Sequence, residues 1–209
     1  MPTHLILIRH GETEWNRQGR IQGHSDSELT VEGIAQAEAC AARLATERID
    51  AVVSSDLPRA WRTAGILAGG SGHAIRPDPG LRERNFGAGE GLTYAEIQDR
   101  YPLLFSRTHA IDADFAPEGG ESRRVFHQRV VASLQRIAAA HGDRTVLVVT
   151  HGGVLAVVYR WLNALPLEHP HRVEIPNVAI NRIDASGEPW QLAVWADTAH
   201  LPSLSLEPG

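Results

Sequence analysis

The stretch that decides the fold is LILIRHGETEWN, from Leu5 to Asn16. Its first four residues form a continuous apolar run, which is typical of a strand buried on both faces, as in a parallel sheet. The run stops at Arg9 and His10, two side chains that can carry positive charge. A buried strand that ends on two such groups needs a partner for them, and the rest of the sequence indicates what that partner is.

Apolar runs and helical patterns alternate along the rest of the chain. The strongest further strand is expected at residues 145–149, and others at residues 50–53, 74–76, 178–183 and 191–195. This alternation predicts an α/β fold with three layers, α/β/α, in which helices cover both faces of a mostly parallel central sheet. The length favours one domain over residues 1–209, with a lid or cap segment around residues 85–116 that contains two short helices.

The expected helices have recognisable start signals. Thr30 suits the N-cap of a helix that runs to about Glu47, and Asp56 suits the N-cap of a helix in which Pro58 stands at an early position. Further helices are expected after the PEGGES segment (residues 117–122) and over residues 153–163. The sequence therefore predicts a helix after each main strand.

The composition argues against several classes of protein. The net charge of −5 does not suit a nucleic-acid or anionic-membrane surface, which is usually basic. Cys40 is the single cysteine, so no intramolecular disulfide can form and a reducing compartment fits best. The apolar run at Leu5 is too short for a signal peptide, and the longest apolar region is interrupted by His151 and two glycines. We expect a cytoplasmic globular protein.

Polar side chains follow several of the predicted strands. In open α/β sheets, ligands bind beyond the carboxyl ends of the strands. Arginines and histidines that converge there would repel one another unless an anion lies between them, and the arginine fork matches a phosphoryl group well. The residues concerned are Arg9 and His10, Ser54, Ser55 and Arg59, Glu83, and His151, Gly152 and Gly153. Together they predict a phosphate pocket.

Each of these pieces also has a purely structural interpretation. Arg9 and His10 alone could be solvated loop residues, and the two glycines after His151 could simply make a tight turn. Glu83 between two arginines could be a surface ion pair that contributes little. The prediction of a site depends on their joint placement after strands.

The motifs themselves resemble those of a known family. RHGETEWN (residues 9–16), SSDLPRAWRTA (54–64), LRERNFGAGEG (81–91), PEGGES (117–122) and VVTHGG (148–153) are similar, in this order, to the motifs of the histidine phosphatase superfamily, the phosphoglycerate mutase-like proteins. The resemblance covers residues 5–163, and the two late strands also fit the phosphoglycerate mutase-like fold.

The resemblance implies a role for each matching residue. His10 would be the nucleophile that forms a phosphohistidine, and Glu83 would protonate the leaving oxygen. The residues that would hold the phosphoryl group are Arg9, Asn16, Gln22, Gly23, Arg59, His151 and Gly152.

Elementary chemistry is consistent with these roles. A histidine nucleophile needs a neutral ring, and the Gly11 carbonyl could fix its tautomer. A carboxyl group that acts as an acid near neutral pH needs a raised pKa, so Arg82 and Arg84 are expected to point away from Glu83. Arginines supply the positive charge, so no metal ligands are expected. His169 and His171 could suggest a metal pair, but we expect a solvated loop there.

The segment at residues 85–116 bears on the reaction. Phosphoglycerate mutases of the family grip the second charged end of their substrate with arginines and a lysine, whereas here the segment has only the arginines Arg100 and Arg107 and no lysine. The sequence therefore favours a phosphomonoester hydrolase without a cofactor. The alternatives are a mutase that depends on 2,3-bisphosphoglycerate, or a catalytically silent module that binds a phosphorylated ligand.

The expected partner is a small phosphorylated substrate, with no nucleic acid and no membrane. Phosphoserine, sugar phosphates, phosphoglycerate derivatives and α-ribazole phosphate are all candidates. Homodimers are common in the family, so a second copy of the chain is a candidate partner too.

Overall fold

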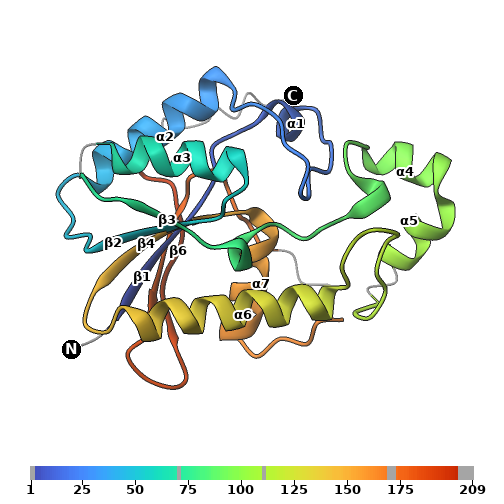
Figure 1. The fold of residues 1–209 in the computed structure, drawn as a ribbon. Coiled ribbons are helices and arrows are strands. Elements are labelled where there is room, and N and C mark those ends of the chain that lie inside the picture. The colour runs from blue at the N-terminus through green and yellow to red at the C-terminus, as the bar shows by residue number, and fades with distance from the viewer. Residues whose placement is uncertain (1–2, 70–71, 110–111, 169–172, 202–209) are drawn as a thin grey trace.

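A mixed six-stranded sheet forms the centre of the molecule (Figure 1). The structure is a computed structural model and describes residues 3–69, 72–109, 112–168 and 173–201. The strand order is β3-β2-β4-β1-β5-β6. The strands are β1 (His4–Arg9), β2 (Ala51–Ser54), β3 (Ile75–Pro77), β4 (Thr145–Thr150), β5 (Ile180–Asp184) and β6 (Gln191–Asp197).

The first four strands of this order run parallel, and the last two are antiparallel to their neighbours. β1 pairs with β4 along its whole length, from His4 opposite Thr145 to Arg9 opposite Thr150. Both strands are buried on both faces, as their uninterrupted apolar runs predict. The carboxyl ends of β1, β2 and β4 therefore meet at one edge of the sheet.

Helices cover both faces of the sheet, which confirms the predicted three-layer fold. The helices α2 and α3 pack on one face through Ile6, Ile8 and their neighbours, and α6 and α7 pack on the other through Leu5 and Leu7. The helices are α1 (Glu14–Arg17), α2 (Val31–Leu44), α3 (Pro58–Ala68), α4 (Tyr94–Arg100), α5 (Pro102–His109), α6 (Arg123–Ala140) and α7 (Gly152–Leu162), with short 3₁₀ turns η1 (Pro79–Leu81) and η2 (Gly87–Gly89).

The start of α3 differs from the prediction. Thr30 caps α2 as expected, but Leu57 holds the N-cap position of α3 and makes no side-chain cap bond. Asp56, which was expected there, instead pairs with Arg82. An acid from a distant loop supplies the cap, because the Asp26 carboxylate accepts the Arg59 backbone N–H at 3.2 Å.

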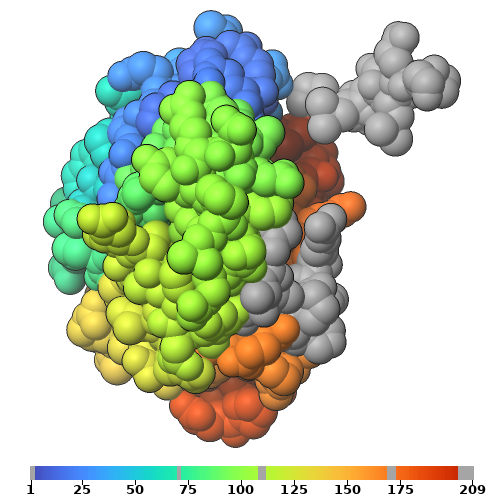
Figure 2. Space-filling model, turned by 90° about the vertical axis from the view of Figure 1, so that its right-hand side faces the viewer, coloured from blue at the N-terminus to red at the C-terminus, as the bar shows by residue number. Residues whose placement is uncertain are grey.

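The helices α4 and α5 project beyond the carboxyl ends of the parallel strands (Figure 1), and their green surface faces the viewer in Figure 2. An ion pair from Arg20 to Glu96 ties α4 to the loop that follows α1, and the same guanidinium also donates to the Gly91 carbonyl. The predicted lid segment contains these two helices. No helix in the described part of the chain is long and apolar enough to cross a membrane.

Candidate active site

A cavity of about 490 Å³ lies at the carboxyl ends of the parallel strands. It is bounded by the end of β1, the starts of α3 and α7, the loop at residues 19–23, and Phe86 and Tyr94 of the lid segment. The predicted residues that line it are Arg9, His10, Asn16, Gln22, Gly23, Arg59, Glu83 and Gly152. The structure therefore brings these segments together at one place.

His10 lies at the base of the cavity as a nearly buried, neutral imidazole. Burial, and then the charges of Arg59 and Arg9, hold the pKa of His10 well below its ordinary value. The Gly11 carbonyl, expected to fix the tautomer, lies 2.8 Å from Nδ1. This contact places the ring proton on Nδ1, and Nε2 keeps its lone pair.

Arg59 is the largest fully buried side chain among the described residues, and the loop after α1 holds it in place. Its Nη2 donates to the Gly23 carbonyl at 2.7 Å, and its Nη1 donates to the Ser25 carbonyl at 2.8 Å and to Asp26. Burial lowers the pKa of Arg59, although Glu83 and Asp26 oppose this shift. The guanidinium is thus fixed before any ligand binds.

Arg9 approaches from the end of β1, and its Nη1 donates to the Ile175 carbonyl at 2.7 Å. Burial lowers its pKa, the Glu83 charge raises it, and the Arg59 charge lowers it. Within the described residues, the buried Nε atoms of Arg9 and Arg59 have no hydrogen-bond partner. Buried donors of this kind are rare, and they indicate the place of a missing acceptor.

His151 lies behind His10, with their ring centroids 5.3 Å apart. Its Nε2 is 2.8 Å from the Ser55 hydroxyl, while its buried Nδ1 has no hydrogen-bond partner among the residues that the structure describes. The Leu57 N–H donates to that hydroxyl, so Ser55 can give its own proton to Nε2. Burial and the Arg59 charge lower the pKa of His151 far below its ordinary value. The ring is therefore neutral and can direct an Nδ1–H toward an anion.

Glu83 is held by two backbone donors. Its Oε1 accepts the Arg84 N–H at 2.8 Å, and its Oε2 accepts the Gly153 N–H at 2.9 Å. The second contact depends on glycine, because a Cβ at position 153 would lie 2.1 Å from Oε1. Gly152, at the first position of α7, lines the cavity where helix N–H groups have no intrahelical acceptor.

The expectation that both neighbouring arginines point away is wrong for Arg84. Arg82 is partly exposed and paired with Asp56, as expected. Arg84 is buried, and its guanidinium donates to the carbonyls of Glu121 and Phe115. These carbonyls belong to the segment before α6. No local sequence pattern indicates that this segment lies next to Arg84.

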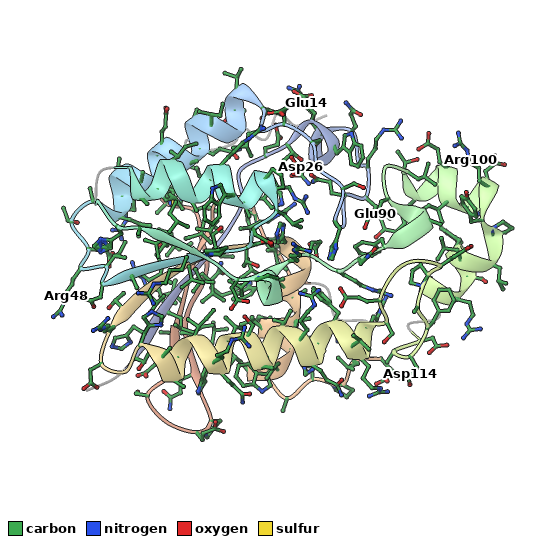
Figure 3. All side chains as sticks on the ribbon, viewed as in Figure 1. Glu14, Asp26, Arg48, Glu90, Arg100 and Asp114 are labelled. Atoms are coloured by element: carbon green, nitrogen blue, oxygen red, sulfur yellow. The ribbon has the colours of Figure 1, made fainter. Side chains whose placement is uncertain are left out.

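Two further residues that position the site were missed. Glu90 accepts the backbone N–H groups of His24, Ser25 and Phe86, and so joins the loop after α1 to the lid segment. Figure 3 labels Glu90 between these parts. Arg129 donates to the backbone carbonyls of residues 80, 82 and 83 and so fixes the loop that carries Glu83. The only sequence signal for Glu90 was an acid within the glycine-rich FGAGEG segment.

Asn16 and Gln22 line the cavity but already have protein contacts. The Asn16 Oδ1 accepts the Thr13 N–H in a capping box, and the Gln22 Oε1 accepts a bond from Ser27 at 3.4 Å.

In the described residues there is no group of three or more His, Cys, Asp or Glu side chains arranged to hold a metal ion. His169 and His171 lie outside the described residues.

Comparison with known proteins places this geometry in a family. The profile of the histidine phosphatase superfamily (branch 1) matches residues 5–198. Phosphoglycerate mutase-like protein 4 of Arabidopsis thaliana is 39% identical over 203 residues, covering 94% of this chain and 86% of that protein. A metal-independent phosphoserine phosphatase of the same plant is 36% identical and covers 97% of this chain and 84% of its own length.

A solved structure gives the same result. The protein YhfR from Bacillus stearothermophilus superimposes with a TM-score of 0.89 at 35% identity, over 95% of this chain and 98% of that one. The predicted resemblance is therefore confirmed, and the chain belongs to the histidine phosphatase superfamily, branch 1, as an enzyme of that family.

Proposed function

We propose that the protein hydrolyses a small phosphomonoester through a phosphohistidine at His10. One observation carries the proposal: a neutral imidazole, with Nε2 unprotonated, lies among buried donors that have no acceptor in the part of the chain that the structure describes. The Nε groups of Arg9 and Arg59 and the Nδ1 of His151 are those donors. A phosphoryl group supplies three equatorial oxygens, and so satisfies all three donors at once.

In the first step, Nε2 of His10 attacks phosphorus and the bond to the substrate oxygen breaks. The proton for the departing oxygen comes from Glu83, which lines the same cavity. The two arginines stabilise the charge on the equatorial oxygens, which is usually the largest catalytic contribution. The products are a phosphohistidine and the free alcohol.

In the second step, water attacks the phosphohistidine. Glu83, now a carboxylate, accepts the proton from water, and the nitrogen–phosphorus bond breaks to release inorganic phosphate and neutral His10. The positive charge comes from side chains at every stage, so we propose that no metal ion is required.

The lid segment favours hydrolysis over phosphoryl transfer to a second substrate. Arg100 lies on the outer side of α4 (Figure 3), and Arg107 is paired with Asp112. Neither lines the phosphoryl cavity. A mutase must exclude water from its phosphohistidine while the substrate reorients in the cavity. These two arginines do not cover the cavity, so they do not exclude water from it.

The test is phosphate release from an aryl phosphate in the presence of excess EDTA. We expect turnover, and rapid quenching without acid should trap phosphate on the wild-type enzyme but not on His10→Ala. Wild-type turnover by His10→Ala would refute the nucleophile, and strict dependence on an added divalent cation would refute the metal-free scheme.

The same assay separates the alternatives. A silent binding module would release no phosphate from any ester. A mutase would convert 3-phosphoglycerate to 2-phosphoglycerate only after priming by 2,3-bisphosphoglycerate, with little phosphate released.

A further inference from the structure

The segment at residues 175–178 lies in the connection between α7 and β5 and holds the end of β1. We call it the clasp. The Ile175 carbonyl accepts a hydrogen bond from Nη1 of Arg9 at 2.7 Å, and the Val178 N–H donates to the Arg9 carbonyl at 3.1 Å. The clasp therefore fixes Arg9 through both its side chain and its main chain.

The backbone of the clasp is strained. The Ala179 N–H donates to the Pro176 carbonyl at 3.4 Å, which closes a turn of four residues. Val178 is the third residue of this turn and has a φ of 51°. Glycine and asparagine suit that conformation, whereas a β-branched residue rarely adopts it. Strain of this kind persists where the surroundings fix it, and it is concentrated at functional sites. The turn therefore indicates a role for the clasp at the neighbouring cavity.

Asn177 extends from this turn to the main chain of the proposed nucleophile. Its Nδ2 donates to the His10 carbonyl at 2.8 Å. A carbonyl oxygen only accepts, so the amide must present its nitrogen there. On the other side of the same peptide bond, the Gly11 N–H donates to Oγ1 of Thr63 at 3.1 Å. The peptide that joins His10 to Gly11 is thus held at its oxygen by Asn177 and at its nitrogen by Thr63.

The same amide nitrogen also orients Asn16. It lies 3.5 Å from Oδ1 of Asn16, which accepts the Thr13 N–H at 3.2 Å. A backbone N–H only donates, so this end of the Asn16 amide must be its oxygen. With the oxygen held by two donors, the NH₂ group of Asn16 can point into the cavity, which Asn16 lines.

We infer that Asn177 is a positioning residue for the proposed hydrolysis, which fixes the His10 main chain for attack by Nε2 and turns the Asn16 NH₂ group toward the phosphoryl oxygens. The inference rests on the proposed function. Asn177 is not among the described residues that line the cavity, so it acts through these two residues. Small displacements are costly at such a site, because a shift of about 1 Å can lower the rate roughly 100-fold.

Two variants test the role. Asn177→Ala and Asn177→Leu both remove the donor, and leucine keeps nearly the size of asparagine. Asn177 is only partly buried, so both variants should fold, as thermal unfolding will show. We expect kcat/KM for an aryl phosphate to fall by about 10- to 100-fold in both. Inorganic phosphate should bind about tenfold more weakly, the effect of one lost hydrogen bond, and calorimetry measures this binding without turnover.

A double variant shows whether Asn177 acts through Asn16. Asn16→Ala removes part of what Asn177 holds in place, so the two effects should overlap. The loss of kcat/KM in the double variant should be at least about threefold smaller than the product of the two single losses.

The matched control is Asn181→Ala. Asn181 is buried in β5 and donates to the Leu7 carbonyl at 3.0 Å, so it makes the same kind of bond to the same strand, away from the cavity. Its loss should lower the temperature of unfolding, while kcat/KM of the folded protein stays close to the wild-type value.

Wild-type kcat/KM in Asn177→Ala or Asn177→Leu would overturn the inference and leave hydrolysis intact. Losses that multiply in full in the double variant, or a loss of the same size in folded Asn181→Ala, would overturn it as well.

No phosphate release from any ester by the wild-type protein would overturn the proposed function instead. In that case the binding of inorganic phosphate decides the inference. Weaker binding by Asn177→Ala supports its action on the anion site, and equal binding refutes it.

Discussion

The contact between Gly153 and Glu83 gives a sharp test of the acid. In Gly153→Ala, the new Cβ would lie 2.1 Å from Oε1 of Glu83, whereas ordinary contacts begin at about 3.4 Å. The carboxylate is the end of a flexible side chain, so it should move by more than 1 Å while the fold is kept. A displacement of about 1 Å at a reacting group can cost roughly 100-fold in rate. We therefore expect kcat for an alkyl phosphate to fall by about that factor.

The leaving group distinguishes a displaced acid from a damaged pocket. Aryl phosphates leave with little protonation, so Gly153→Ala should slow them much less than alkyl phosphates. The control is Gly65→Ala within α3, where the added Cβ would point into open space among the described residues. This control should keep its activity and unfold at the same or a higher temperature, because alanine favours helix. Equal slowing of both ester types by Gly153→Ala, or a wild-type rate on alkyl esters, would refute the assignment of Glu83.

Three further predictions follow from the buried polar groups. The pKa values of His10 and His151 in the folded protein lie below the unfolded value of about 6.5, so their contribution to stability is complete above that pH and is lost as the pH falls below it. The free energy of unfolding, measured with urea, should therefore fall by about 1.3 kcal/mol per histidine between pH 7 and pH 5.5. The same free energy of unfolding at both pH values would contradict the argument from burial. Ser55→Ala leaves Nε2 of His151 without its partner, so we expect a loss of about 1–3 kcal/mol in unfolding free energy together with a lower kcat; unchanged kcat would mean that the tautomer does not matter. Asp26→Ala removes the cap of α3 and a contact of Arg59, so it should lower the free energy of unfolding by about 0.5–2 kcal/mol and raise KM. Asp26→Asn keeps a hydrogen-bond acceptor and should recover most of this stability. Equal losses of stability in both variants would show that the charge of Asp26 alone matters.

The groups at strand ends could be placed from the sequence because parallel strands align their carboxyl ends. Arg9 ends β1, His10 follows it, and His151 follows β4, the adjacent strand that is paired with β1 along its length. Local patterns fix these strands, and the topology of an α/β sheet brings their ends together. The same reasoning placed Arg59 at the start of a helix after β2.

The supporting residues could not be placed in this way. Asp26 caps α3 from a loop more than thirty positions earlier, and Glu90 connects two loops that are distant in sequence. Arg84 was misplaced for the same reason, because its acceptors belong to the segment before α6. Contacts between loops depend on how close the loops come after packing, and neither propensity nor periodicity records that distance.

The pairing of β1 with β4 also has a consequence for the order in which the chain can fold. Both neighbours of β1 come late in the sequence. On one side lies β4, in which Val146 pairs with Leu5, and on the other side lies β5, which comes later still. Contacts between such distant segments form slowly, because a long loop must close first. During synthesis, which proceeds from the N-terminus, β1 must therefore wait for most of the chain to emerge from the ribosome. Until then its apolar run is open to other partners, and a nascent chain that stops before Thr145 should depend on chaperones to stay soluble.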